Sequence, residues 1–231
     1  MSTIIDHGVA LMAWMQLHDS AFPAGRLVHS HGLEEWLAQR PDADPDEVSA
    51  AVIDYLVHSF APLDATITAA ACRAADAPDV LCDLDDLIGS YKLFDNARAA
   101  SQSTGAQLAT VASQSGMVVP CRYLDGVLAG NHAGHCAVVE GAVQGRLGIP
   151  VHTAVAGSIR SMLASMLSSA VRLGRLGPMR SQQVQARLAP TVVELAHDAC
   201  RRSPHDVWST APALEIGGMC HETRTMRQFA S

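Results

Sequence analysis

The chain has 231 residues, of which 48% are hydrophobic and 17% charged, enough apolar side chains for one domain with a sizeable core. Its formal net charge is −7, and this acidic balance excludes a nucleic-acid-binding protein, because a phosphate backbone selects for clustered Lys and Arg. The basic residues are fifteen arginines and Lys92, which follows no glycine-rich loop, so a P-loop nucleotide hydrolase is excluded too.

The first residues, MSTIIDH, lack the basic segment and the long apolar run of a secretory signal, so we expect a cytoplasmic protein. Its six cysteines are far apart and form no CxxC pair, which in a reducing compartment predicts free thiols. The most apolar stretch, residues 153–173, is interrupted by Arg160 and several serines and ends in Arg172. We therefore expect no membrane-spanning segment and no membrane partner.

The pattern is helical throughout, because alanine is abundant and alternating Val/Ile/Thr runs are nearly absent. The clearest helix start is at residues 44–47, where Asp44 offers an N-cap oxygen, Pro45 suits the first helical position and Glu47 completes a capping box. Apolar residues then recur near the helical period as far as Phe60. Pro62 interrupts or kinks that helix, and a second segment continues to residue 75.

Further helices are predicted downstream, separated by short links that contain Gly or Pro. Links of this length are typical of a helical bundle. The expected ranges are residues 84–97, 99–115, 134–147, 153–173 and 181–202. Small residues three or four positions apart within 153–173 would let another helix approach closely, and we interpret this segment as a buried central helix rather than a dimer seam.

The sequence therefore predicts an all-α fold, a single-domain bundle of about 8 to 10 helices spanning residues 1–231. The C-terminal residues 210–231 look different, because residues 212–219 (PALEIGGM) show no helical period and a charged stretch follows them. We expect an irregular tail that becomes ordered on a partner. Arg227 and Phe229 near its end pair a cation with an aromatic ring, a common interface combination.

Eleven histidines raise the question of a metal site, since imidazole binds nickel, zinc and copper. His29 and His31 are two positions apart, a spacing that puts them on different faces of a helix, whereas His132 and His135 could share a face. Neither pair has the spacing of a closed site, so we expect no permanently bound cofactor. The candidates for a transient metal contact are His135, Cys220 and His221.

No pattern for nucleophilic catalysis is present, since the chain has neither GxSxG nor a recognised cysteine signature. Ser30 lies between two histidines, but a Ser–His pair adjacent in sequence seldom has catalytic geometry. We interpret Ser30 as the N-cap of a helix over residues 32–37. The protein is therefore not expected to be an enzyme.

Three blocks of the chain together resemble the UreF family of urease accessory proteins. The first is LHDSAFPAG at residues 17–25, followed by HSHGLE at residues 29–34. The second comprises NARAAS at residues 96–101, Gly134 with His135, and AVRLGRLG at residues 170–177. The third is APALEI at residues 211–216, then HE at 221–222 and RQFAS at 227–231.

Two departures from the family pattern involve three residues. Arg26 and Leu27 stand where a small residue and an aromatic are usual, and Gln228 replaces the usual leucine before Phe229. Partner contacts at these positions are therefore not carried over.

The resemblance implies an all-α protein without turnover of its own that takes part in loading nickel into apo-urease, with nickel as cargo. It implies a homodimer whose tail binds the UreD/UreH scaffold. It also implies that the homodimer recruits the UreG GTPase and modulates the GTP hydrolysis of that partner. The partner-binding residues that the resemblance implies are Ser30, Gly32, Glu34, Arg172, Pro212, His221, Glu222, Arg227 and Phe229.

Two other classes of protein stay open at this point. One is a helical adaptor unrelated to nickel, which binding to apo-urease complexes would distinguish. The other is a metal-dependent hydrolase that uses either His132, His135 and Glu140 or the tail ligands Cys220, His221 and Glu222. Such an enzyme would retain a stoichiometric metal after chelation.

Overall fold

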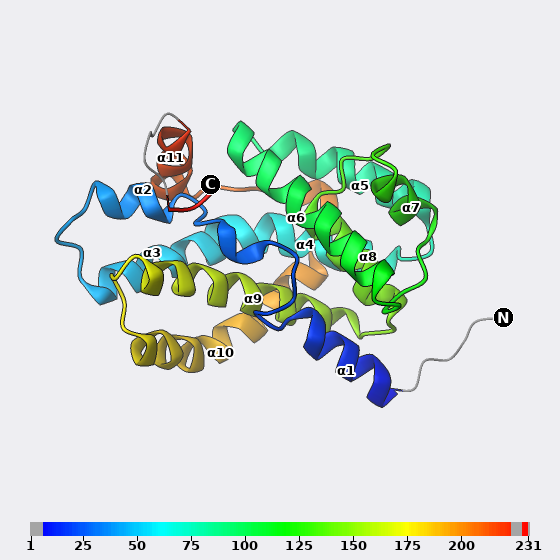
Figure 1. The fold of residues 1–231 in the computed structure, drawn as a ribbon, viewed down its shortest axis with the longest axis horizontal. Coiled ribbons are helices and arrows are strands. Elements are labelled where there is room, and N and C mark those ends of the chain that lie inside the picture. The colour runs from blue at the N-terminus through cyan, green and yellow to red at the C-terminus, as the bar shows by residue number, and fades with distance from the viewer. Residues whose placement is uncertain (1–6, 223–227, 231) are drawn as a thin grey trace.

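The computed structural model describes residues 7–222 and 228–230, and over these residues the chain is all-helical, with eleven α-helices and no strand (Figure 1). The predicted fold class is confirmed, with one helix more than the upper end of the expected number. The division into one domain with a partner-binding tail at residues 210–231 stays a prediction.

The elements follow one another with short connections. In chain order they are α1 (His7–Leu17), the 3-10 turn η1 (Arg26–Val28), α2 (Leu33–Ala38), α3 (Pro45–Tyr55), the π-helical segment η2 (Leu56–Ala65), α4 (Thr66–Arg73), α5 (Pro78–Tyr91), α6 (Asp95–Gln114), α7 (Arg122–Leu128), α8 (Cys136–Arg146), α9 (Val151–Arg172), α10 (Pro178–Arg201), the 3-10 turn η3 (Pro204–Asp206) and α11 (Pro212–His221).

The long helix α9 crosses the middle of the molecule and packs against α10 and α4 (Figure 1). Helices α5, α6, α7 and α8 gather at one end, and α2, α3 and α11 lie at the other (Figure 1). Two clusters of buried apolar side chains follow this division, one including Leu108 and Val138, the other Leu33 and Ile159. Helix α4 joins them, because Ile67 belongs to the first cluster and Ala69 to the second.

The start of α3 is the predicted capping box. Asp44 Oδ1 accepts hydrogen bonds from the amides of Asp46 (2.8 Å) and Glu47 (2.9 Å), and Glu47 Oε2 accepts one from the amide of Asp44 (2.8 Å). Pro62 does not end the helix. The chain continues through η2 in a wider π-helical register into α4, which accommodates a residue that has no amide proton to donate.

Two predicted helix boundaries in the middle of the chain are wrong. The helix expected over residues 84–97 corresponds to α5, which already ends at Tyr91. The next helix, α6, begins at Asp95, so the break between the two lies at residues 92–94 rather than at residue 98. Helices α5 and α10 also begin earlier than expected, because Pro78 and Pro178 occupy their first positions. Helices α1 and α7 were not predicted.

The prediction of an irregular tail at residues 212–219 is wrong, because residues 212–221 form α11. Its buried residues are Leu214, Gly217, Gly218 and His221, which lie at helical spacing i, i+3, i+4 and i+7. Two glycines and a histidine do not register as an apolar stripe in the sequence. Only the packing against α2 shows which face is turned inward.

Helix α9 is long and apolar enough to cross a membrane by composition alone, but 61% of its most apolar window is buried against other helices of the chain. A small residue of α9 allows another helix of the same chain to pack closely against it. A Cβ atom on Gly157 would lie 2.7 Å from both Trp14 of α1 and His18, the residue that follows this helix, so the glycine lets α1 lie against α9. This agrees with the interpretation of α9 as a central helix.

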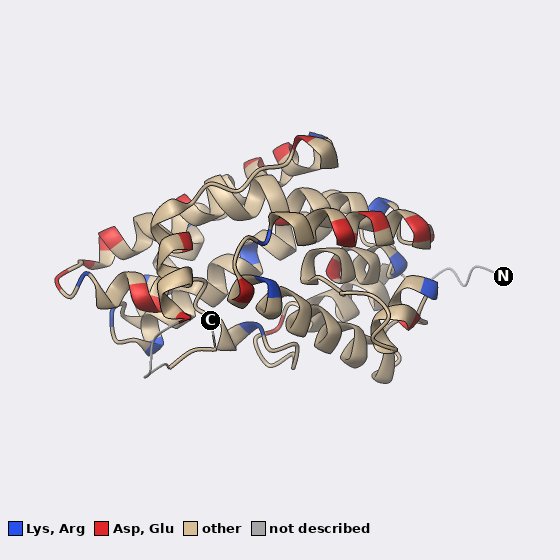
Figure 2. Cartoon of the chain, turned by 90° about the horizontal axis from the view of Figure 1, so that it is seen from above, with Lys and Arg blue, Asp and Glu red and all other residues tan. Residues whose placement is uncertain are grey.

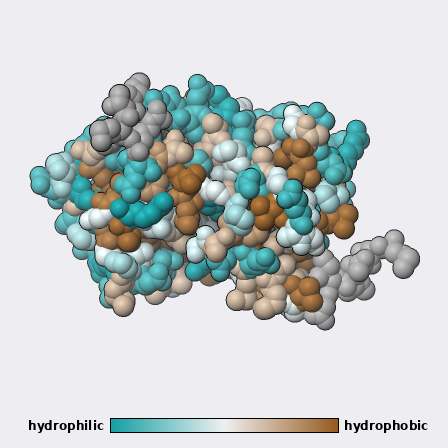
Figure 3. Space-filling view, in the orientation of Figure 1, coloured by the Kyte–Doolittle hydropathy of each residue, from teal (hydrophilic) through white to brown (hydrophobic). Residues whose placement is uncertain are grey.

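Charged positions are scattered over the chain, with basic residues spread among acidic ones (Figure 2). On the face shown in Figure 3, hydrophobic patches alternate with hydrophilic areas. The exposed apolar residues include Val9, Met12 and Met15 on α1, and Ile216 and Met219 on α11.

Candidate partner-binding site

Glu34 of α2 is the centre of a cluster that joins the two ends of the chain. Its carboxylate accepts hydrogen bonds from the amide of Gln228 (2.9 Å), the amide of Phe229 (3.1 Å) and Nε2 of His221 (3.0 Å). Burial alone would raise the pKa of Glu34, but the hydrogen bonds from Gln228, His221 and Phe229 lower it below the usual 4.5. Glu34 is therefore ionised at neutral pH and holds the tail segment 228–230 against α2.

Arg172, at the end of α9, contacts the same segment. Its guanidinium carbon lies 4.2 Å from the centre of the Phe229 ring, and its Nη2 donates a hydrogen bond to the carbonyl of Leu27. The ring of Phe229 is buried at 4% exposure. A further backbone hydrogen bond joins the amide of Ala230 to the carbonyl of Val28 (2.8 Å), so residues 228–230 are fixed at several points.

Glu222, the C-cap residue of α11, connects this helix to α6. Its Oε1 accepts a hydrogen bond from the amide of Asn96 (2.9 Å) in the first turn of α6. The N-cap position of α6 is Phe94, which has no side-chain acceptor, so the carboxylate of Glu222 satisfies an otherwise unpaired amide at the positive end of that helix.

Gly32 lets α11 cross α2 at very short range. A Cβ atom on Gly32 would lie 2.0 Å from the carbonyl oxygen of Leu214, and its φ of 82° is in the left-handed region. The predicted cap is corrected here, because Gly32 and not Ser30 is the N-cap residue of α2. The hydroxyl of Ser30 still accepts a hydrogen bond from the amide of Glu34 (3.4 Å) in the first turn.

The structure thus brings most of the predicted partner-binding residues to one place. Ser30, Gly32 and Glu34 come from the start of α2, Arg172 from the end of α9, and His221, Glu222 and Phe229 from the C-terminal part. Pro212 is the first residue of α11 and is exposed. Arg227 lies outside the described residues. The role of these residues in partner binding stays a prediction.

Sequence reasoning missed three members of this cluster. They are the carbonyl of Leu27, the amide of Asn96 and the ring of Phe94, which lies against Gly218. Two are backbone groups, which carry no side-chain signal. The pair Gly217–Gly218 was the available clue, since adjacent glycines in a helix indicate close contact with a neighbouring element.

The three candidates for a transient metal contact do not form one site. His135 has different partners, since its amide donates to Asp85 (2.7 Å) and its Nδ1 lies 3.1 Å from the hydroxyl of Ser101. Cys220 is exposed and His221 is engaged with Glu34. In the part of the chain that the structure describes, no group of three or more His, Cys, Asp or Glu side chains is placed to hold a metal ion.

The residues of the hydrolase hypothesis are also held in different surroundings. The ring of His132 stacks on Tyr123 at 5.6 Å, whereas Glu140 accepts a hydrogen bond from Ser158 (2.8 Å) and pairs with Arg26. With His135 bound to Asp85 and Ser101, these three side chains do not converge on a common point.

The departures from the family pattern have structural explanations. The side chain of Arg26 turns inward, where its Nη2 lies 3.3 Å from Glu140 and its Nη1 donates to the carbonyl of Leu17 (3.0 Å). Leu27 contributes its carbonyl to Arg172, and Gln228 its amide to Glu34. The backbone contacts of Leu27 and Gln228 do not depend on the identity of their side chains.

The outward face of α11 is the exposed part of the site. Ile216 is 56% exposed and Met219 is 42% exposed, while the inward face is bound to α2 and α6. Leu93, next to the Phe94 ring that contacts Gly218, is 71% exposed. Such an arrangement presents apolar side chains on a helix whose opposite face is packed against the body of the protein.

Comparisons with known proteins agree on one family. The UreF family model matches residues 43–189 of the chain. The urease accessory protein UreF of Kocuria rhizophila is 32% identical over 229 residues, which cover 96% of this chain and 97% of that protein. The UreF proteins of Cereibacter sphaeroides strain KD131 (29% over 220 residues, 95% and 98% covered) and Bacillus sp. strain TB-90 (25% over 226 residues, 96% and 99% covered) are also similar.

Proposed function

Because the chain belongs to the UreF family of urease accessory proteins, we propose that it bridges the UreD/UreH scaffold and the UreG GTPase while nickel is inserted into apo-urease. In this role it is a cytoplasmic homodimer without turnover, which handles nickel only as cargo of the complex and modulates the GTP hydrolysis of its partner. The names of the relatives support the part in urease maturation.

One observation carries the assignment of the scaffold contact to α11. The inner face of this helix is fixed by Glu34 and Gly32, while the side chains of Ile216 and Met219 are partly exposed to solvent. Burying exposed apolar side chains is the main favourable term in association. A helix that is already ordered loses less conformational entropy on binding than a disordered tail would.

The experiment is co-purification of the full-length chain with the scaffold protein and with the GTPase. We expect Ile216→Asp and Met219→Asp to weaken scaffold binding at least about tenfold, because each buries a charge in an apolar contact. The matched control is Met179→Asp on α10, a methionine that is 72% exposed and far from α11 in sequence. It is expected to leave binding unchanged.

Point substitutions test the site more sharply than a truncation at Ser209, since removing α11 would also expose α2 and the buried Leu214. Normal scaffold binding by both aspartate variants would move the contact away from α11. Absence of binding by the unmodified chain to scaffold and GTPase alike would favour the adaptor unrelated to nickel.

A further inference from the structure

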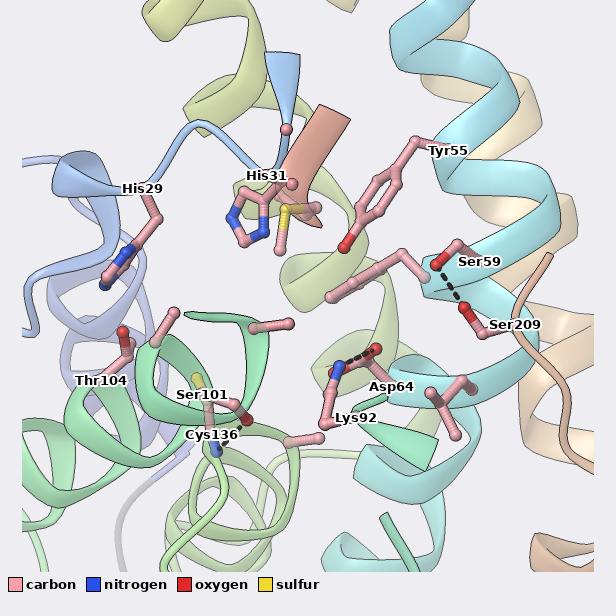
Figure 4. Close-up of a pocket in the computed structure, with 18 of the residues that line it drawn as sticks. His29, His31, Tyr55, Ser59, Asp64, Lys92, Ser101, Thr104, Cys136 and Ser209 are labelled. Carbon is pink, nitrogen blue, oxygen red and sulfur yellow. Dashed lines mark hydrogen bonds and ion pairs between the residues drawn. The ribbon is translucent and has the colours of Figure 1, made fainter. Parts of the chain in front are cut away.

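A cavity of about 130 Å³ lies beneath α11, between the π-helical segment η2 and helices α6, α8 and α9 (Figure 4). Leu214 and Gly218 of α11 form part of its wall, so the same helix that carries the candidate partner surface also covers the cavity. Neither the family comparison nor the partner contacts account for this space.

The charged groups of the cavity wall are already engaged. Lys92, the only lysine of the chain, lies 2.8 and 2.9 Å from the two carboxylate oxygens of Asp64, and Arg26 pairs with Glu140 at 3.3 Å. Glu215 accepts hydrogen bonds from the Ser209 hydroxyl (2.9 Å) and the Ala211 amide (3.2 Å). An anion entering the cavity would lose its hydration shell without gaining a new counter-charge, because Lys92 and Arg26 are already paired, and the carboxylate of Glu215 is satisfied by neutral donors.

The polar side chains that face the cavity from the α2 side are neutral at pH 7. Burial lowers the pKa of His31 to about 3, with His29 and Lys92 acting in the same direction, and burial also lowers the pKa of His29. Tyr55 stays protonated, because burial raises the pKa of its hydroxyl. His31 and Tyr55 point into the cavity in Figure 4, with 5.8 Å between their ring centres.

The backbone holds His31 in an unusual conformation to achieve this. Its φ of 53° is the only left-handed value among the non-glycine residues that the structure describes. A side chain in this region costs about 1 kcal/mol or more relative to an ordinary conformation. The neighbouring Gly32 is left-handed as well, so the turn that brings α2 under α11 also directs the imidazole into the cavity.

The rest of the wall is mainly apolar and comes from several elements, among them Phe60, Leu63, Phe94, Met162 and Leu214. Apolar cavities of on the order of 150 Å³ are known to accept benzene-sized molecules. The small volume, the pairing of both cations in the wall and the neutral side chains of His29, His31 and Tyr55 on one side together define what the cavity can hold.

We propose that this cavity is a binding site for a small neutral aromatic molecule that carries one hydroxyl or N–H group. The ring lies against the apolar wall, and the polar group exchanges a hydrogen bond with His31 or Tyr55. Because α11 forms part of the wall, the bound molecule also holds α11 against the body of the protein. The binding itself does not depend on the proposed role in urease maturation.

Phenol is the probe, added to the full-length chain labelled with ¹³C at the methionine methyl groups. Met162 and Met219 line the cavity, whereas Met179 is exposed on α10 and serves as the internal control. We expect saturable shifts of the Met162 and Met219 signals and none at Met179. Amide hydrogen exchange in α11 is expected to slow with phenol, while exchange in α5 stays constant.

A matched pair of variants tests the location. Ala97 lines the cavity and Ala99 is exposed on the same helix, α6. Ala97→Leu fills the space and is expected to weaken phenol binding at least about tenfold, whereas Ala99→Leu is expected to leave it unchanged. Thermal unfolding of both variants shows whether the fold is retained.

Benzoate and benzylammonium, which match phenol in ring size but carry a charge, are expected to bind at least about tenfold more weakly. The proposal is overturned if phenol leaves Met162 unshifted, if Ala97→Leu binds phenol as tightly as Ala99→Leu, or if a charged analogue binds as well as phenol. Such results would leave the co-purification experiment unaffected, so the two proposals fail independently.

Discussion

Nε2 of His221 lies 3.0 Å from Oε2 of Glu34, a residue 187 positions earlier in the chain, and both side chains are buried. The contact ties α11 to α2 from within. It also explains how a helix with two glycines on its inner face can be held firmly: polar contacts replace apolar area that the glycines cannot supply.

Glu34→Gln is expected to release the tail segment. An amide has one acceptor oxygen in place of two, so at least one of the donors Gln228, His221 and Phe229 loses its partner. We expect the free energy of unfolding to fall by about 1–3 kcal/mol and the amides of residues 228–230 to exchange faster. Urea unfolding and hydrogen exchange measure the two effects.

The neighbouring Glu35→Gln is the control for this change, since Glu35 contacts Gln39 on the exposed side of α2. We expect its effect on stability to stay within about 0.5 kcal/mol. Equal effects of the two substitutions would contradict the central position of Glu34.

A comparison of Gly32→Ala with Gly25→Ala distinguishes the cost of a steric overlap at Gly32 from the cost of a left-handed backbone conformation. Both glycines are left-handed, with φ of 82° and 77°, but a Cβ on Gly25 meets nothing within 4 Å, whereas one on Gly32 would overlap the Leu214 carbonyl. We expect Gly25→Ala to cost about 1 kcal/mol and Gly32→Ala distinctly more, with loss of α11 docking. Equal losses in urea unfolding would show that strain alone matters at Gly32.

Lys92→Met is expected to destabilise the protein by about 3–5 kcal/mol, because it leaves the buried carboxylate of Asp64 without a counter-charge. The double variant Lys92→Met/Asp64→Leu should recover most of this loss, since no charge then remains buried. A double-mutant cycle in urea measures the coupling. A double variant as unstable as the single one would mean that Lys92 contributes by packing instead.

Stability is expected to fall as the pH drops below 6.5. Burial lowers the pKa of His18, as do Arg26 and Arg160, while Glu140 and Gln144 act against them. The unfolded chain therefore takes up a proton near pH 6.5 that the folded chain binds only at lower pH. The contribution of neutral His18 to the free energy of unfolding is complete above pH 6.5. It is lost progressively below that pH, at up to about 1.4 kcal/mol per pH unit.

Urea unfolding at pH 7.5 and 5.5 checks this dependence. His18→Gln is expected to reduce the difference, because glutamine can still bond to Ser161 without titrating. The exposed His205→Gln serves as the control and should leave the difference unchanged. A larger loss at pH 5.5 in His18→Gln would reverse the assigned direction.

The sequence alone determined the features that depend on neighbouring residues. The capping box at Asp44 and Glu47 was predicted because its three hydrogen bonds lie within four residues. The all-helical class followed from composition and period, and the resemblance to the UreF family followed from short motifs that the family comparison bears out. All of these signals are local or compositional, so they can be recognised before the chain is folded.

Only the tertiary structure decided what α11 and Lys92 do. The helix was missed because its inner face has two glycines and a histidine beside Leu214, and the partner of His221, Glu34, is 187 positions away in sequence. Lys92 appeared only as an isolated lysine until Asp64 was found beside it in a cavity wall. The physical reason is the same in both cases: a buried polar group is stabilised by the particular donor or acceptor that faces it, and helix packing, not local sequence, brings the two together.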